Sequence, residues 1–133
     1  MRSVVLADTG PLYAAVDPDD QYHARAQQEL KRLEQEGLTV EVAYSTITEC
    51  YTLVQRRLGL NVARGWLREI LDAATLVNPT SDDYLAAVTR VHAYADQPLT
   101  LFDVVLVILS ERLGVPVWTY DYHFDIMQAT VWR

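Results

Sequence analysis

Hydrophobic and polar residues alternate along the chain in blocks that are typical of strands and helices. Short apolar runs rich in β-branched residues predict buried strands at residues 3–7, 38–43, 74–77 and 115–120. Apolar residues three or four positions apart predict amphipathic helices at residues 21–36, 44–58, 62–73 and 80–95. A short helix at residues 11–16 and a last short strand at residues 130–132 complete the pattern.

One more helix is predicted at residues 101–113, and its part up to Leu109 is apolar on every side except at Asp103. A helix that is hydrophobic all round is a buried helix. An aspartate is almost never fully buried unless it is paired or coordinates something. The nearest cation along the chain is Arg112. We therefore expect Asp103 to meet other acids, and with them a metal ion, from distant parts of the chain.

The alternation of apolar strands with long helices predicts βαβ units and a mainly parallel sheet. Helices cover both faces of such a sheet, which gives an α/β fold of three layers, α/β/α. With 133 residues and no repeat, linker or low-complexity tract, we expect a single domain over residues 1–133. Ligands of such folds bind outside the carboxyl ends of the strands, where the strand order switches direction.

Composition narrows the class of protein further. Half of the residues are hydrophobic, and neither a signal peptide nor a membrane span is recognisable, so we expect a cytoplasmic globular protein. The single Cys50 excludes an internal disulfide and a cysteine-cluster metal site. The net charge of −7 gives no general attraction for nucleic acid. An enzyme that acts on nucleic acid would need a local basic patch or a basic partner at this net charge. We expect the arginines to cluster along one groove.

Four acids fall at or just after predicted strand ends or early in the following helices: Asp8, Glu49, Asp103 and Asp121. Each also has a purely structural interpretation. Asp8 is placed to cap a helix, and Glu49 and Asp103 can form capping boxes with Thr46 and Thr100. Asp121 can be a turn residue. These interpretations stay open for each acid taken alone.

Taken together, the four acids favour a shared site. Four carboxylates at one sheet edge repel one another and raise one another's pKa. A bound divalent cation usually offsets such repulsion. Ligands that are all oxygen suit Mg²⁺ or Mn²⁺ and argue against zinc.

The four segments that carry these acids resemble, in the same order, those of the PIN domain, the nuclease fold of the VapC-type toxins. They are V-L-A-D-T-G-P-L-Y-A, T-I-T-E-C-Y-T-L-V, T-L-F-D-V-V-L-V-I-L and V-P-V-W-T-Y-D-Y-H-F. The resemblance runs over the whole chain. One departure is Phe102, since the family often has Ser or Thr directly before the third acid; Thr100 is the candidate replacement.

The resemblance implies a metal-dependent endoribonuclease that hydrolyses RNA phosphodiesters, with Asp8, Glu49, Asp103 and Asp121 as catalytic residues and ligands of Mg²⁺ or Mn²⁺. It implies supporting roles for Thr9, Thr100, His123 and Asp125, and it makes Arg56 and Arg57 candidates for RNA binding. The number of metal ions and the RNA target stay open. The family commonly forms homodimers, and its toxin members bind a cognate antitoxin.

Other functions of the same fold class lack their motifs. Asp8 is followed by Thr9 and Gly10, so the Asp-x-Asp pair of haloacid-dehalogenase-type phosphatases is missing. The only lysine, Lys31, lies too early for a response-regulator receiver, and there is neither a G-x-G-x-x-G nor a Walker A sequence. Two alternatives remain open: a PIN nuclease of RNA processing outside any toxin pair, and a catalytically silent PIN-like module that binds RNA or protein.

Overall fold

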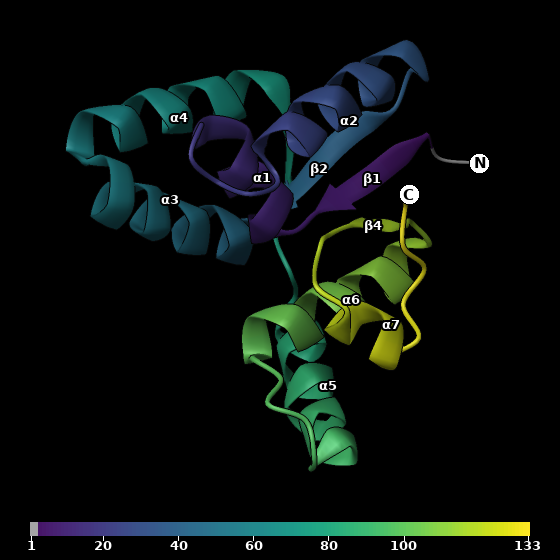
Figure 1. Cartoon of the computed structure of the whole chain (residues 1–133). Helices are drawn as coiled ribbons and strands as arrows, with labels where there is room; N and C mark the ends of the chain where they lie inside the picture. The colour runs from purple at the N-terminus through teal and green to yellow at the C-terminus, as the bar shows by residue number, and fades with distance from the viewer. Residues whose placement is uncertain (1–2) are drawn as a thin grey trace.

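The fold is built on a parallel β-sheet, as a computed structural model of residues 3–133 shows (Figure 1). The strands are β1 (Val4–Ala7), β2 (Thr39–Ala43), β3 (Thr75–Val77) and β4 (Val117–Trp118), in the order β3-β2-β1-β4. All three pairs of neighbouring strands are parallel. The predicted α/β architecture is therefore confirmed.

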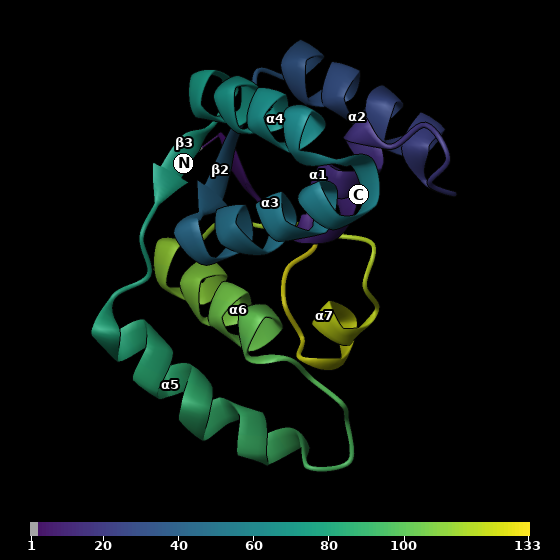
Figure 2. The same cartoon turned by 90° about the vertical axis from the view of Figure 1, so that its left-hand side faces the viewer.

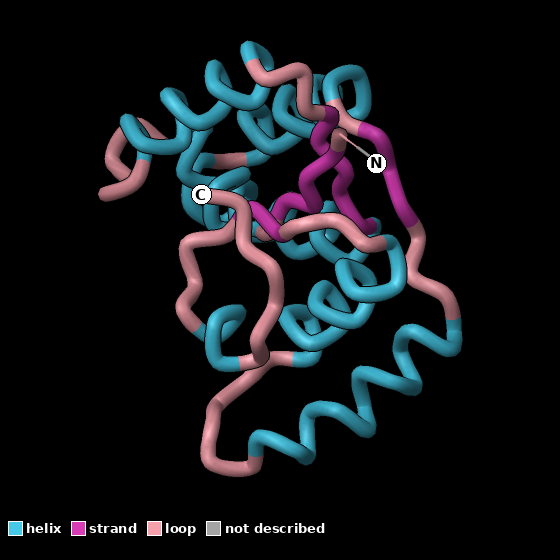
Figure 3. Tube along the Cα trace, turned by 90° about the vertical axis from the view of Figure 1, so that its right-hand side faces the viewer, coloured by secondary structure: helices cyan, strands magenta, loops and turns pink. Residues whose placement is uncertain are grey.

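Helices cover both faces of the sheet (Figures 1 and 2). The first layer holds α1 (Thr9–Val16), α2 (His23–Gln35), α3 (Tyr44–Leu58) and α4 (Leu60–Ala73). The second layer holds α5 (Ser81–Val91), the 3₁₀ turn η1 (His92–Tyr94), α6 (Leu101–Leu113) and α7 (His123–Ile126). Figure 3 shows the strands lying between these two groups of helices.

Strand β1 shows how the sequence builds the two layers. Its side chains alternate between the faces of the sheet. Leu6 packs into the core formed with α6 and α7, whereas Val5 and Ala7 pack into the core formed with α1 to α4. All three side chains are fully buried. Burial of each large apolar side chain stabilises the fold by about 1.5–3 kcal/mol, which explains the uniformly apolar run.

The strand order places the switch point between β1 and β4. The chain passes from β1 to β2 and β3 on one side, and it then returns to add β4 on the other side of β1. Asp8 follows β1 and Asp121 lies just beyond β4. The backbone N–H of Asp8 donates to the carbonyl of Trp118 at 2.9 Å, so the two strand ends lie side by side.

The strand predicted at residues 115–120 is shorter than expected, because only Val117 and Trp118 are paired as a strand. Pro116 has no N–H to donate to a ladder. The strand predicted at residues 130–132 is reduced to a single parallel bridge between Val131 and Val117. The predicted loop at residues 121–124 contains the start of α7, so the sequence interpretation missed a helical turn.

Several helix boundaries also differ from the prediction, among them those of α4 and α5. Helix α4 begins at Leu60, and Gly59 at its N-cap position has a positive φ of 96°, a conformation that glycine adopts without strain. The helix predicted to reach residue 95 ends at Val91 and continues as η1. Within the described residues, no helix is long and apolar enough to cross a membrane.

Helix α6 is less enclosed than its apolar sequence predicts. Residues 104–110 are buried, but Leu101 is 50% and Phe102 is 46% exposed. The first turn of α6 therefore extends beyond the core toward the carboxyl edge of the sheet. Asp103 is accordingly half-buried rather than sealed inside the protein.

Candidate functional site

A cleft of about 410 Å³ opens at the carboxyl edge of the sheet. All four acids singled out from the sequence line it, namely Asp8, Glu49, Asp103 and Asp121. Thr9 and Thr100 line it as well. The described residues that line this cleft include neither lysine nor arginine, so no guanidinium or ammonium group in its wall offsets the charge of the carboxylates.

Asp8 stands at the end of β1, at the N-cap position of α1. Its side chain makes no capping hydrogen bond, so the helix-cap interpretation is wrong for the carboxylate. The carboxylate is 9% exposed, and it accepts a 2.8 Å hydrogen bond from the hydroxyl of Thr119. Burial raises its pKa from 3.8 to about 7, and the charges of Asp103 and Glu49 add to the rise.

Asp103 enters the cleft from the first turn of α6. The hydroxyl of Thr100 caps the helix by accepting a 3.2 Å hydrogen bond from the backbone N–H of Asp103. This cap aligns the first turn of the helix and brings the carboxylate to the cleft. Burial, followed by the charge of Asp121, raises the pKa of Asp103 to about 6.

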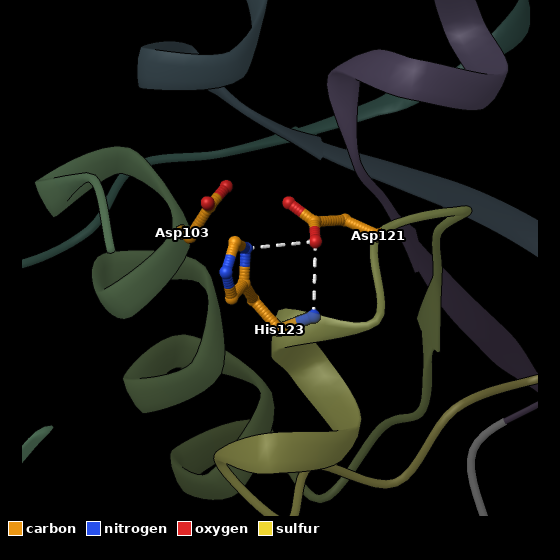
Figure 4. A group of neighbouring side chains, drawn as sticks. All are labelled: Asp103, Asp121 and His123. Atoms are coloured by element: carbon orange, nitrogen blue, oxygen red, sulfur yellow. Dashed lines mark hydrogen bonds and ion pairs between the residues drawn. The ribbon is translucent and has the colours of Figure 1, made fainter. Parts of the chain in front are cut away.

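Asp121 and His123 form a small unit at the start of α7 (Figure 4). One carboxylate oxygen of Asp121 accepts from the backbone N–H of His123 at 2.9 Å and lies 2.9 Å from its imidazole Nδ1. The turn interpretation of Asp121 is therefore correct, and it does not exclude a second role. In Figure 4 the carboxylates of Asp103 and Asp121 point into the same space beside the His123 ring. Potential ligand atoms of these three residues lie within 4.8 Å of one another.

Glu49 lies on α3, and its carboxylate accepts a short hydrogen bond from the hydroxyl of Thr9. No side-chain cap occurs at the N-terminus of α3, so the predicted capping box with Thr46 is wrong. Thr9 is the first residue of α1, directly after Asp8. The Thr9 hydroxyl thus links the wall of the cleft that carries Asp8 to the wall that carries Glu49.

Comparison of the whole fold with solved structures identifies its type. VapC20 of Mycobacterium tuberculosis, described as a sarcin–ricin-loop-cleaving toxin, superposes with a TM-score of 0.87 over 97% of this chain and 98% of its own. The chain has the PIN-domain fold of the VapC toxins. Sequence identity to VapC20 is 18%, which is consistent with a shared fold and a diverged sequence.

Two further PIN-like neighbours cover the chain almost completely. VapBC2 from Rickettsia felis, solved with a fragment of promoter DNA, has a TM-score of 0.71, 10% identity, and 96% coverage of both chains. FitAcB from Neisseria gonorrhoeae has a TM-score of 0.68, 17% identity, and covers 97% of this chain and 96% of its own. No family model matches the sequence, and no curated protein does.

Asp125 does not join the acids of the PIN-like cleft. Its carboxylate forms an ion pair with Arg133 at 2.8 Å, and its side chain is 49% exposed. Arg57 is also directed elsewhere, since its guanidinium lies 5.1 Å from the ring centre of buried Tyr13. Arg56 lines an adjoining cleft of about 530 Å³ that shares Thr9 and Glu49 with the acidic one.

The arginines do not follow one groove, so this prediction is wrong. Five described arginines are paired with carboxylates on different parts of the surface: Arg25–Glu29, Arg32–Glu36, Arg90–Glu111, Arg112–Asp83 and Arg133–Asp125. Acids outnumber bases in this chain, and an arginine near a carboxylate gains a charge-assisted hydrogen bond. Most guanidinium groups are therefore used within the protein.

Sequence reasoning missed Thr119. Its hydroxyl donates to Asp8 and accepts a 3.0 Å hydrogen bond from the backbone N–H of Asp121. It is 6% exposed and bridges the two acids that follow β1 and β4. The only available signal was its position at the end of a predicted strand, two residues before Asp121.

The residues present fit a hard divalent cation. The donors are carboxylate oxygens, which suit Mg²⁺ and Mn²⁺. Asp8 and Asp103 have raised pKa values because burial and mutual repulsion disfavour their charged forms. A dication would reverse both effects, since it favours ionised ligands.

Proposed function

We propose that this chain is a metal-dependent endoribonuclease that hydrolyses RNA phosphodiesters in the cytoplasm, as the toxin of a type II toxin–antitoxin pair. One observation carries the proposal: four carboxylates from separate segments line one cleft at the switch point of a PIN-like fold. The toxin function of VapC20, whose fold this chain shares over almost its full length, supports the choice of activity.

Asp8, Glu49, Asp103 and Asp121 would hold one or two Mg²⁺ or Mn²⁺ ions. When bound in such a site, a divalent cation lowers the pKa of water and stabilises the charge that builds on a phosphate in the transition state. No nucleophilic side chain is required for this chemistry.

The other residues of the cleft hold the carboxylates in place. Thr119 orients Asp8, and Thr9 orients Glu49. His123 orients Asp121 through the hydrogen bond from its backbone N–H and through the contact of Nδ1 with the same oxygen. Partners of this kind tune ligand orientation and basicity in metal sites. Asp8 and Asp103 would hold the ion in their ionised forms, because a carboxylate ligand must be deprotonated.

The substrate backbone is proposed to run from the acidic cleft into the adjoining cleft that Arg56 lines. The two clefts adjoin at the residues Thr9 and Glu49, which line both of them. Arginine forms bidentate hydrogen bonds with phosphate. The contact of Arg57 with Tyr13 leaves Arg56 as the better candidate for a backbone phosphate one or two nucleotides from the cut.

The proposal includes two protein partners, a second copy of the chain and a cognate antitoxin. An apolar cleft of about 570 Å³ lies between α3, α5 and α6, and it includes the exposed side chains of Tyr44, Tyr84, Val88, Leu101 and Phe102. Exposed apolar side chains that lie together on a surface are candidates for contact with another protein. We assign this surface to the homodimer. Light scattering on the purified protein should give twice the mass of one chain. Val88→Asp should lower the measured mass toward that of a single chain.

The nuclease proposal is tested by incubating the pure protein with a mixed RNA pool and Mg²⁺, Mn²⁺ or EDTA. Cleavage should require the metal, and it should be lost in Asp8→Asn and Asp103→Asn. Asp82→Asn, which changes an acid in the first turn of α5, should cleave like the wild type. A folded protein that cuts nothing with either metal would favour the silent binding module.

The toxin role is tested separately by inducing the gene in a bacterial host. Expression should arrest growth, and Asp8→Asn should abolish the arrest. RNA cleavage in vitro without growth arrest would favour a PIN nuclease of RNA processing.

A further inference from the structure

Two tyrosines form part of the wall of the acidic cleft. Tyr22 precedes α2, and Tyr120 follows β4, and both line the cleft beside Asp8 and Asp121. Their ring centroids are 4.9 Å apart and their planes are tilted by 47°. Tyr22 is 36% exposed, so it remains accessible from solvent although its ring contacts a second one.

The ring of Tyr120 is fixed from behind. Its hydroxyl donates a 2.5 Å hydrogen bond to Glu29 on α2, and Glu29 also accepts from the indole N–H of Trp118 at 3.0 Å. Glu29 is 9% exposed, so this anchor is largely protected from water. Tyr120 therefore holds one orientation at the base of the cleft wall.

Arg25 is not a lining residue of the cleft, but it places a positive charge against the two rings. Its guanidinium carbon lies 4.4 Å from the ring centroid of Tyr120 and 5.9 Å from that of Tyr22. An ion pair with Glu29 at 3.5 Å keeps the guanidinium there. The backbone N–H of Tyr22 donates to the carboxylate of Asp20 at 2.8 Å, which orders the segment that carries the exposed ring.

This arrangement differs from the other cation–aromatic contacts of the chain. Arg57 lies over Tyr13, which is buried, and Arg32 lies over Trp132, which does not line the acidic cleft. Tyr22 combines an exposed ring, a supporting aromatic neighbour and a nearby guanidinium at the edge of the proposed reaction centre. Single-stranded RNA is bound by stacking of unpaired bases on such rings, and arginine strengthens the contact.

We propose that Tyr22, supported by Tyr120 and Arg25, forms a stacking subsite for one unpaired nucleobase next to the phosphodiester that is cut. The inference rests on the proposed function, because it names a subsite for the RNA of that same cleft. The subsite selects an RNA segment with a base turned out of a helix. Arg56 lies in the adjoining cleft, which shares Thr9 and Glu49 with the acidic one.

The test uses a single-stranded RNA that the wild-type protein cuts at one position, chosen from the mixed pool. A set of these RNAs carries an abasic nucleotide at each position in turn. One abasic position near the cut should lower kcat/KM of the wild type by about 5- to 150-fold, the range expected for one lost base–aromatic stack. The same substrate should lower kcat/KM of Tyr22→Ala less than twofold, because the ring that the base contacts is already gone.

Two substitutions at the same position separate stacking from packing. Tyr22→Phe keeps the ring and should retain the full abasic effect, whereas Tyr22→Leu keeps the apolar bulk and should lose it. Circular dichroism and melting temperature establish that each variant is folded. The subsite is overturned if every variant shows the wild-type abasic profile, or if Tyr22→Leu retains the effect. Either result would leave the proposed nuclease function intact, provided that the wild type still cuts RNA with metal. Failure of the nuclease function itself would appear as uncut RNA in every reaction.

Discussion

The hydroxyl of Thr119 donates a 2.8 Å hydrogen bond to the carboxylate of Asp8. This bond connects the end of β4 to the residue that follows β1, on the two sides of the switch point. The same hydroxyl accepts from the backbone N–H of Asp121. One buried hydroxyl thus sets the relative position of two proposed metal ligands that are far apart in sequence.

Thr119→Val removes this hydroxyl and nearly preserves the shape of the side chain. Loss of a hydrogen bond that orients a metal ligand typically lowers metal affinity or activity by about 10- to 100-fold. We expect a drop of that size in kcat/KM for RNA, together with a higher Mg²⁺ requirement. Thr119→Ser keeps the hydroxyl and should stay within about threefold of the wild type. Equal activity of the Val and Ser variants would contradict the positioning role.

Asp8→Asn should stabilise the metal-free protein. Burial raises the pKa of Asp8 from 3.8 to about 7, so its ionisation opposes folding, and this penalty grows as the pH rises through that interval. At pH 8 in EDTA the substitution should raise the free energy of unfolding by about 1–3 kcal/mol, and the gain should disappear at pH 4. Urea unfolding of both proteins at pH 8 and at pH 4 measures this difference in the free energy of unfolding. A gain that is independent of pH would show that the charge of Asp8 is not its cause.

Asp83 provides a contrasting acid outside the cleft. It accepts two hydrogen bonds from Arg112, at 2.9 and 2.8 Å, and it forms a capping box with Thr80 at the start of α5. These contacts hold its pKa below the ordinary value. The stability that they contribute is therefore present at neutral pH and is lost as the pH falls through that lowered pKa.

Asp83→Asn should accordingly lower the free energy of unfolding at pH 7 by about 1–2 kcal/mol, through the lost cap and ion pair. Thermal melts at pH 7 and pH 3 should show the difference shrinking at the lower pH. RNA cleavage at 25 °C should be unchanged, because the protein remains folded. Loss of cleavage by a folded Asp83→Asn protein would contradict the claim that Asp83 stabilises the fold and takes no part in the acidic cleft.

His123→Leu should reduce activity through Asp121. The imidazole Nδ1 lies 2.9 Å from the carboxylate, and asparagine offers an amide donor at a comparable position. We expect His123→Leu to lower kcat/KM by about 10-fold or more, and His123→Asn to recover most of it. Rescue by asparagine separates the orienting hydrogen bond from simple packing of the ring. Similar losses in both variants would assign a different role to the imidazole.

The sequence predicted those site residues that stand out from an apolar run beside them. Asp8 follows an apolar strand, Asp103 interrupts an apolar helix, and Asp121 follows the last apolar run. Parallel strands bring such positions to one edge whatever their distance in sequence. For this reason the architecture and the convergence of the acids at one cleft could be predicted without coordinates.

Contacts between side chains from different elements could not be predicted in the same way. The hydrogen bond from Thr119 to Asp8 and the contact between the rings of Tyr22 and Tyr120 depend on how segments far apart in the sequence pack against one another. Neither has a periodic signal. The prediction that the arginines share one groove failed for a related reason. Arg90 on α5 pairs with an acid on α6, and Arg112 on α6 pairs with an acid on α5.

The most direct measurement is calorimetric titration of the purified protein with Mn²⁺, carried out with the wild type, Asp8→Asn, Asp103→Asn and Asp83→Asn. The four carboxylates of the cleft should bind Mn²⁺ in the wild type and in Asp83→Asn with the same affinity. Binding should weaken by at least about 10-fold in Asp8→Asn and in Asp103→Asn. Undiminished binding in both of these variants, or no binding to a wild-type protein that still cuts RNA, would contradict a metal centre at this cleft.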